Sequence, residues 1–148
     1  MVAQITMEQN PIQRQGLKRT MIWETAPTVT TQGAYCVKQG TNDEHIVETA
    51  AVTDKSIGFV NSDSSNPLDS PTVAVGDRAT VYGHGNIVWA KCNGAVARGD
   101  SCTPSTQGRI APRGAVATTL YQVCAHALSA GADADFIPVE VRLFEMTA

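Results

Sequence analysis

The stretch FIPVEVRLFEM, residues 136–146, decides the fold class because its apolar and charged side chains alternate. Glu140 and Arg142 fall on one face of an extended chain. The apolar residues of the other face are Ile137, Val139, Val141 and Leu143. A period of two is typical of a half-buried β-strand, so we expect a strand here.

The chain from residue 33 onward has the sequence pattern of an all-β domain, since short apolar runs are separated by Gly, Asp, Asn, Ser and Pro. Further strands are expected at residues 34–39, 45–52, 56–62, 78–83, 86–92, 109–114 and 118–128. No long helical pattern with a good cap is present, so any helix should be short. The polar segment 61–72 is expected to be an exposed loop of this domain, which spans 33–148.

Two Gly-Asp pairs occupy equivalent positions in two similar stretches. Gly76 and Asp77 lie in VAVGDRA, and Gly99 and Asp100 lie in VARGDSC. Glycine accepts a positive φ, and aspartate can accept hydrogen bonds from amides one or two residues further on, so each pair predicts a structural turn. We therefore interpret the triplet that begins at Arg98 as a turn and not as an integrin-binding motif.

The first 32 residues differ from the domain that follows. Their apolar side chains are scattered among Gln, Thr, Arg and Lys without a sustained period, which predicts a long extended arm. Because these side chains have no visible partner in their own domain, we expect the arm to bind a protein surface outside that domain. The candidate anchors are Ile5, Met7, Ile12, Leu17, Met21, Ile22 and Trp23.

Composition excludes several classes of partner. A chain of 148 residues with 43% hydrophobic content is long enough for one domain with a core of its own. The net charge of -3, without long runs of either sign, argues against nucleic acid and anionic membranes as partners. The sequence has neither a span-length apolar run nor a secretion signal, so we expect synthesis in a cytoplasm.

The residues that commonly carry chemistry form no recognisable constellation. The cysteines are widely spaced without a C-x-x-C pair, which predicts free thiols and no zinc site. They are Cys36, Cys92, Cys102 and Cys124. The histidines, which have no nucleophile setting nearby, are His45, His84 and His126. Asp133 and Asp135 in GADAD fail the EF-hand pattern and predict a polar turn. We expect no metal, no cofactor and no enzymatic activity.

The order of turns and strands adds a resemblance to these observations. SIGFV is followed by VAVGDRATVYGHGNIVWA, then by AVARGDSCTPSTQGRIAPRG, and finally by YQVCAHALSAGADADFIPVEVRL. From about residue 33 to residue 146 the chain thereby resembles the capsid cement, or head decoration, proteins of tailed bacteriophages. In that family a Gly-Asp turn leads a strand, a second Gly-Asp with a P-S-x-x-G-R continuation follows, and an alternating valine strand ends the domain.

The resemblance implies a compact β-barrel or β-tulip-like domain that forms homotrimers on a capsid. The implied function is that of a structural virion protein on the capsid surface, which stabilises the head by bridging subunits of the major capsid protein. The chain departs from the family pattern in its long arm and in the segment 61–72. Under this resemblance we expect the anchors of the arm to bind the capsid or a neighbouring subunit. The alternative from another class is a phage tail or baseplate module, or a β module that binds a host ligand. A small β-barrel enzyme is the third alternative.

Overall fold

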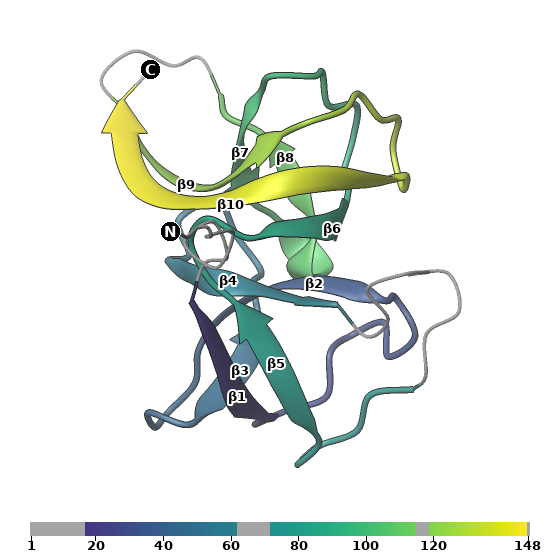
Figure 1. Ribbon diagram of the computed structural model, residues 1–148, viewed down its shortest axis with the longest axis vertical. Helices are drawn as coiled ribbons and strands as arrows, with labels where there is room; N and C mark the ends of the chain where they lie inside the picture. Colours follow the sequence, from purple (N-terminus) through teal and green to yellow (C-terminus); the bar gives the residue numbers. More distant parts are fainter. Residues whose placement is uncertain (1–16, 62–71, 115–118, 148) are drawn as a thin grey trace, which may run out of the picture.

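The computed structural model describes residues 17–61, 72–114 and 119–147. Over these ranges the chain forms ten β-strands and one short 3₁₀ helix, so the all-β prediction is confirmed. The first five strands close into a barrel, and the other five form a second sheet beside it (Figure 1). No helix within the same ranges is long and apolar enough to cross a membrane.

The barrel has the strand order β1-β3-β2-β4-β5. Its strands are β1 Lys18–Trp23, β2 Ala34–Gln39, β3 His45–Glu48, β4 Ser56–Asn61 and β5 Arg78–Tyr82. Neighbouring strands are antiparallel except β1 and β3, which are parallel. Large side chains fill the interior: Trp23 and Tyr35 meet edge to face with ring centroids 5.3 Å apart, beside Met21 and Ile46.

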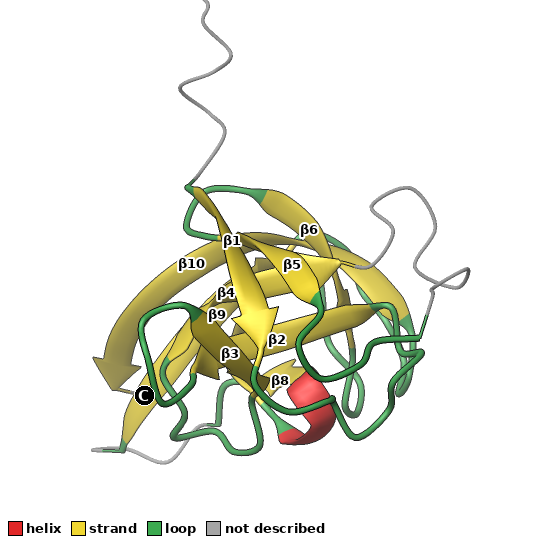
Figure 2. Ribbon diagram, turned by 90° about the horizontal axis from the view of Figure 1, so that it is seen from below, coloured by secondary structure: helices red, strands yellow, loops and turns green. Residues whose placement is uncertain are grey.

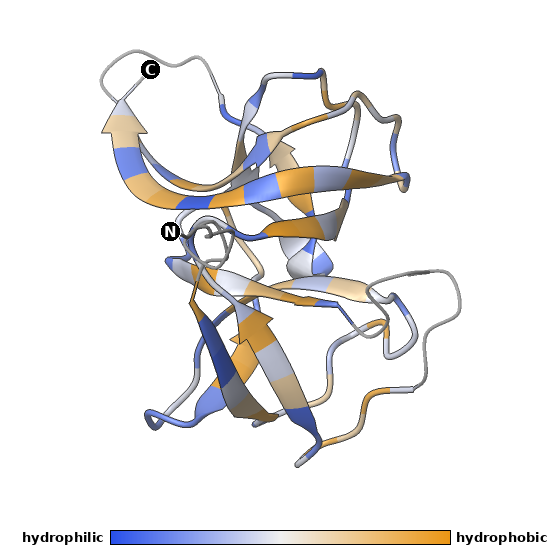
Figure 3. Ribbon diagram, viewed as in Figure 1, coloured by the Kyte–Doolittle hydropathy of each residue, from blue (hydrophilic) through white to orange (hydrophobic). Residues whose placement is uncertain are grey.

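The second sheet has the strand order β6-β10-β9-β7-β8. Its strands are β6 Ile87–Lys91, β7 Ser101–Pro104, β8 Ile110–Pro112, β9 Leu120–Ala127 and β10 Phe136–Thr147, and the helix η2 Thr106–Gly108 joins β7 to β8. A parallel bridge between Cys92 and Ile110 brings the two edges of this sheet together. Figure 2 shows β10 curving along the outside of the molecule, and Figure 3 shows its alternating hydropathy.

Strands β2 and β4 form a wall that the two halves share. Tyr35 and Val37 of β2 belong to the core of the barrel, whereas Cys36 between them belongs to the core of the second sheet. In β4, Val60 faces the barrel core and Phe59 faces the second core. Both faces of these strands are therefore buried, and neither half has a complete core without them.

Four turns in the described residues have the same hydrogen bonds. Each begins at an alanine, whose N–H donates to the carboxylate of an aspartate three residues later, over 2.8 to 3.1 Å. The aspartate N–H donates back to the carbonyl of the alanine over 3.1 Å. The aspartates are Asp54, Asp77, Asp100 and Asp135. The last three directly precede β5, β7 and β10, so the turn serves as an entry to a strand.

The segment that was expected to be an arm differs from the prediction over its second half. Residues 18–23 form β1, which pairs with β5 from Lys18 to Ile22 and closes the barrel. Met21 and Trp23 are 2% and 1% exposed, so they are core residues of their own domain and not external anchors. The domain that was placed at 33–148 therefore includes β1.

Strands β4 and β5 approach each other most closely at Gly58. This residue has a φ of 146°, and a Cβ atom there would lie 2.3 Å from the backbone oxygen of Tyr82. Only glycine fits such an approach without displacing the neighbouring backbone. Gly58 thus permits the contact between β4 and β5 that completes the ring of strands.

The edge of the second sheet at β6 is covered by one side chain of the barrel. Asn61, at the end of β4, donates from Nδ2 to the carbonyl of Trp89 over 2.9 Å. Its Oδ1 accepts the N–H of Trp89 over 2.9 Å. The amide therefore makes the two hydrogen bonds that a neighbouring strand would make with this residue.

Candidate functional site

The histidines and cysteines lie in separate structural settings. His45 is 3.4 Å from Glu24, and His84 accepts the backbone N–H of Leu143 at Nδ1 over 3.1 Å. No group of three or more His, Cys, Asp or Glu side chains in the described ranges is arranged to hold a metal ion. The candidate sites in the described residues are therefore recesses of the surface.

All four cysteines are free, buried thiols that belong to the core of the second sheet. Burial is the main cause that raises the pKa of Cys102 to about 12 and that of Cys92 to about 11. Burial likewise raises the pKa of Cys124. Because the thiolate is the reactive form, these side chains act as small apolar groups in the folded protein.

The two Gly-Asp pairs have equivalent backbone geometry. Gly76 and Gly99 have φ of 86° and 91°, and no atom lies within 4 Å of the position that a Cβ would take. Asp77 and Asp100 accept from amides three residues earlier, rather than from amides that follow them as expected. The exposed side chain of Arg98 takes no part in these hydrogen bonds, so the triplet that begins there is a strand-entry turn.

The predicted anchors lie in three different settings. Met21 and Trp23 come together in the barrel core, and Ile22 on the opposite face is half-buried. Leu17 is 79% exposed. Ile5, Met7 and Ile12 lie outside the described residues, as do residues 62–71 of the predicted loop. The structure therefore leaves Leu17 as the exposed anchor within the described part of the chain.

Leu17 stands at an open end of the barrel, which we call the barrel mouth. Here β1 and β4 begin and β2 and β5 end, and the interior is not filled by a large side chain. A cleft of about 330 Å³ remains, lined by Leu17, Arg19, Gln39, Ser56, Ile57, Val81, Gly83, His84 and Leu143. Mouths of β-barrels are among the usual places for a binding site.

Period-two geometry explains the composition of the barrel mouth. The inward-facing row of β1 passes from Trp23 through Met21 to Arg19 and then to Leu17. Arg19 Nη2 lies 3.3 Å from the sulfur of Met21, so its guanidinium stands at the boundary between core and opening. The backbone carbonyl of Leu17 accepts from Gly83 over 2.7 Å and from the Asn86 amide over 3.0 Å. The rim is therefore a fixed structure.

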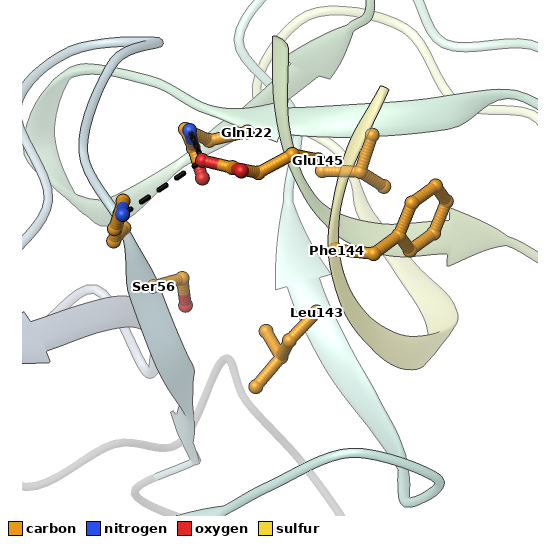
Figure 4. A pocket seen from close by; sticks show the side chains of 7 residues that line it. Ser56, Gln122, Leu143, Phe144 and Glu145 are labelled. Atoms are coloured by element: carbon orange, nitrogen blue, oxygen red, sulfur yellow. Dashed lines mark hydrogen bonds and ion pairs between the residues drawn. The ribbon is translucent and has the colours of Figure 1, made fainter.

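A second hollow of about 210 Å³ adjoins the barrel mouth and shares Ser56 and Leu143 with it (Figure 4). A register shift in β10 between Val141 and Phe144 places Leu143 here. Glu145 closes the other side through an ion pair with Lys55 at 3.8 Å and a hydrogen bond from Gln122. The mouth and the hollow are thus neighbouring recesses that share two lining residues.

A third depression lies along the covered edge of β6. Ile87 is 69% exposed there, and a cleft of about 230 Å³ runs between it, Trp89, Pro138 and Tyr82. Pro138 lies opposite Trp89 in the ladder between β6 and β10, so the outward row of this edge is apolar. None of these recesses corresponds to a contiguous sequence motif, because each combines residues from several strands.

A comparison with solved structures found a similar fold. The sequence matched no protein-family model and no curated protein. One solved structure with a similar fold is described as the N base of the head fiber gp8.5 of bacteriophage phi29. The two chains superpose with a TM-score of 0.51 at 14% sequence identity, over 85% of this chain and 93% of the other. At this level of identity the likeness is one of fold.

Proposed function

We propose that this protein is a structural component of a tailed-phage particle that binds the outer surface of the head. In this role it stabilises the shell by bridging subunits of the major capsid protein, and it acts as a homotrimer. It is made in the cytoplasm of the host bacterium and then added to the capsid surface.

The observation that carries the proposal is the likeness in fold to the head fiber base, which extends over most of both chains. The resemblance of residues 33–146 to head decoration proteins supports it from a different direction, because it rests on the order of short sequence motifs. Both point to a protein on the outside of a phage head.

The physical properties of the domain suit this role. A protein that clamps a shell must keep its shape under load, and here one wall of two strands is buried by two cores at once. Apolar side chains stay exposed on several faces, such as Ile87, Leu120 and Phe144, and are available for contacts with other subunits. A trimer multiplies such contacts, since binding through one copy raises the effective concentration of the other two.

The amino-terminal residues supply further contact area under this proposal. Ile5, Met7 and Ile12 precede the described domain, and each would contribute about 1.5 to 3 kcal/mol on burial, before the cost of ordering the chain. With Met21 and Trp23 assigned to the core, the attachment segment is confined to residues 1–16 and Leu17.

The test is to add the purified protein to phage heads that were prepared without it. We expect saturable binding in a sedimentation assay, labelling of heads in negative-stain images, and a higher temperature of head disruption. Heads that already carry their full complement are the matched control and should bind none. Labelling of tails or baseplates would favour the alternative module, and absence of any binding to heads would contradict the proposal.

A further inference from the structure

The barrel mouth has the chemistry of a site for an apolar side chain. Val81 at its base is 3% exposed, and Ile57 and Leu143 line its walls. The charged side chain on the rim of β1 is Arg19, whose guanidinium stands over the opening. An occupant should therefore present apolar side chains together with a negative charge.

The segment that precedes the described domain has these properties. Ile5 and Met7 are two residues apart, so they share one face of an extended chain. Glu8 follows them and is the one charged side chain among the first 13 residues. The sequence of this segment therefore complements the barrel mouth in both apolar character and charge.

The geometry at Leu17 favours a neighbouring copy over the same chain as the donor. The carbonyl of Leu17 is held by Gly83 and Asn86, and its side chain stands on the rim of its own mouth. The preceding residues would have to reverse direction beside this rim to enter the same mouth. Ile5 lies 12 residues before Leu17, and an extended chain of that length spans roughly 40 Å, which matches the diameter of about 30 to 40 Å expected for a domain of this size. The segment is thus long enough to reach another subunit.

We propose that the barrel mouth binds Ile5 and Met7 of a second copy of this chain. This inference rests on the homotrimer of the proposed function. It identifies the contact that links one copy to the next. Each copy gives its amino-terminal segment to the next and receives one in its own mouth. Such a head-to-tail exchange closes into a ring when the rotation between copies is three-fold.

Photo-crosslinking of the full-length protein tests this contact directly. Met7 is replaced by p-benzoylphenylalanine in an equal mixture of ¹⁴N-labelled and ¹⁵N-labelled chains. We expect cross-links from position 7 to peptides that contain Val81, His84 or Leu143, in pairs that join the two isotopes. Single-isotope pairs alone, with no mixed pairs, would mean that the segment folds back into its own mouth, and cross-links to other surfaces would mean that the mouth is not the site. Either result overturns the proposal.

A pair of matched substitutions tests the mouth without disturbing the core. Leu17 and Val75 are 79% and 66% exposed, so arginine at either position is compatible with folding. Leu17→Arg should weaken self-association by about tenfold or more, as loss of an apolar contact implies, and Val75→Arg should leave it unchanged. Equal effects of the two substitutions on light scattering would contradict the mouth as the site.

The two proposals fail in distinguishable ways. A trimer in light scattering without cross-links to the mouth would remove this inference and leave the homotrimer in place. A strict monomer without isotope-mixed cross-links would remove both the exchange and the homotrimer. Binding to heads, measured separately, tests the role on the capsid in either case.

Discussion

The two halves of the molecule bury different kinds of side chain. The core of the barrel is built on Trp23, Tyr35, Met21 and Ile46, whereas the second core contains four cysteines and three alanines. The second core also contains Phe59, Ile110, Ile137 and four valines, so its small residues are packed among larger ones. Protein interiors are close-packed. The barrel core should therefore be most sensitive to the loss of a large side chain, and the second core to the addition of volume at a small one.

The largest effect should come from removing the strand that closes the barrel. A chain that begins at Thr28 lacks β1, so Tyr35 loses Trp23 and the edges of β3 and β5 are left open. We expect this chain to lose cooperative unfolding in a urea titration. A chain that begins at Leu17 is the control and should still unfold in one cooperative transition, because it retains β1. Equal stability of the two shortened chains would mean that β1 is dispensable.

A large-to-small substitution in the barrel core and a small-to-large substitution in the second core test how the two cores differ. Trp23→Ala should lower the free energy of unfolding by about 3 to 5 kcal/mol, because it leaves a large cavity. Ala125→Leu overfills the small-residue core and should cost about 1 to 3 kcal/mol. Three of the thiols, those of Cys92, Cys102 and Cys124, lie in the second core and outside the barrel strands, so their labelling reports on that half. Labelling and circular dichroism should give one transition for Trp23→Ala, because β2 and β4 couple the halves, and two separate transitions would contradict the shared wall.

Substitutions at two glycines with positive φ distinguish the cost of a steric clash from the cost of an unfavourable backbone conformation. Gly58→Ala places a methyl group against the backbone of Tyr82 and should cost about 2 to 3 kcal/mol, as strained backbone positions do. At Gly76 nothing lies near the added Cβ, so Gly76→Ala should cost about 1 kcal/mol. Thermal melts measure both. A larger loss at Gly76 would mean that the contact between β4 and β5 is not tight.

A smaller effect is expected at the turn that leads into β7. Asp100→Ala removes the carboxylate that accepts the Ala97 N–H and should cost about 1 kcal/mol. Arg98→Ala changes an exposed side chain of the same turn and should stay within about 0.5 kcal/mol of the wild type. If Arg98→Ala were the more damaging substitution in denaturant titrations, the triplet would have a role that the turn does not explain.

The smallest expected effect depends on pH and concerns Asp54 at the entry to β4. Partial burial acts to raise the pKa of Asp54, but the amides of Ala50 and Ala51 and the Lys38 ammonium at 2.9 Å hold it below its usual value. The carboxylate therefore stabilises the fold above about pH 4, and this contribution is lost as the pH falls further. Asp54→Asn should cost less than about 1 kcal/mol at pH 7, as for a partly exposed pair, and should match the wild type near pH 2. A difference that persisted at pH 2 would point to packing instead of charge.

The positions of strands were predictable from the sequence where apolar side chains alternate clearly with polar ones or form a short run. The strands β2, β4, β5, β6, β9 and β10 lie where alternating or apolar runs placed them. Strand β1 was missed because its inward row includes Arg19 at the barrel mouth, which breaks the apolar pattern. Strand β7 was missed because it has four residues and buries a threonine, Thr103. Short strands are specified by their neighbours more than by their own period.

Long-range arrangement was not predictable in the same way. The two stretches that begin at Gly76 and Gly99 read as the same order of turns and strands, yet β5 and β6 enter different sheets while β7 and β8 pair as a hairpin. The barrel mouth likewise combines residues from β1, β2, β4, β5 and β10, which no spacing in the sequence connects. Register between distant strands depends on which faces become buried, and that is decided only when the chain folds.

Under the proposed function many copies gather on one surface, and there the amide of Asn61 protects the edge of β6. An open strand edge is a template on which other chains add strands, and crowding favours such growth into fibres. At Trp89 the template is already occupied by a side chain of the same molecule. Copies of this protein can therefore be concentrated side by side while β6 remains unavailable as a seed for aggregation at that residue.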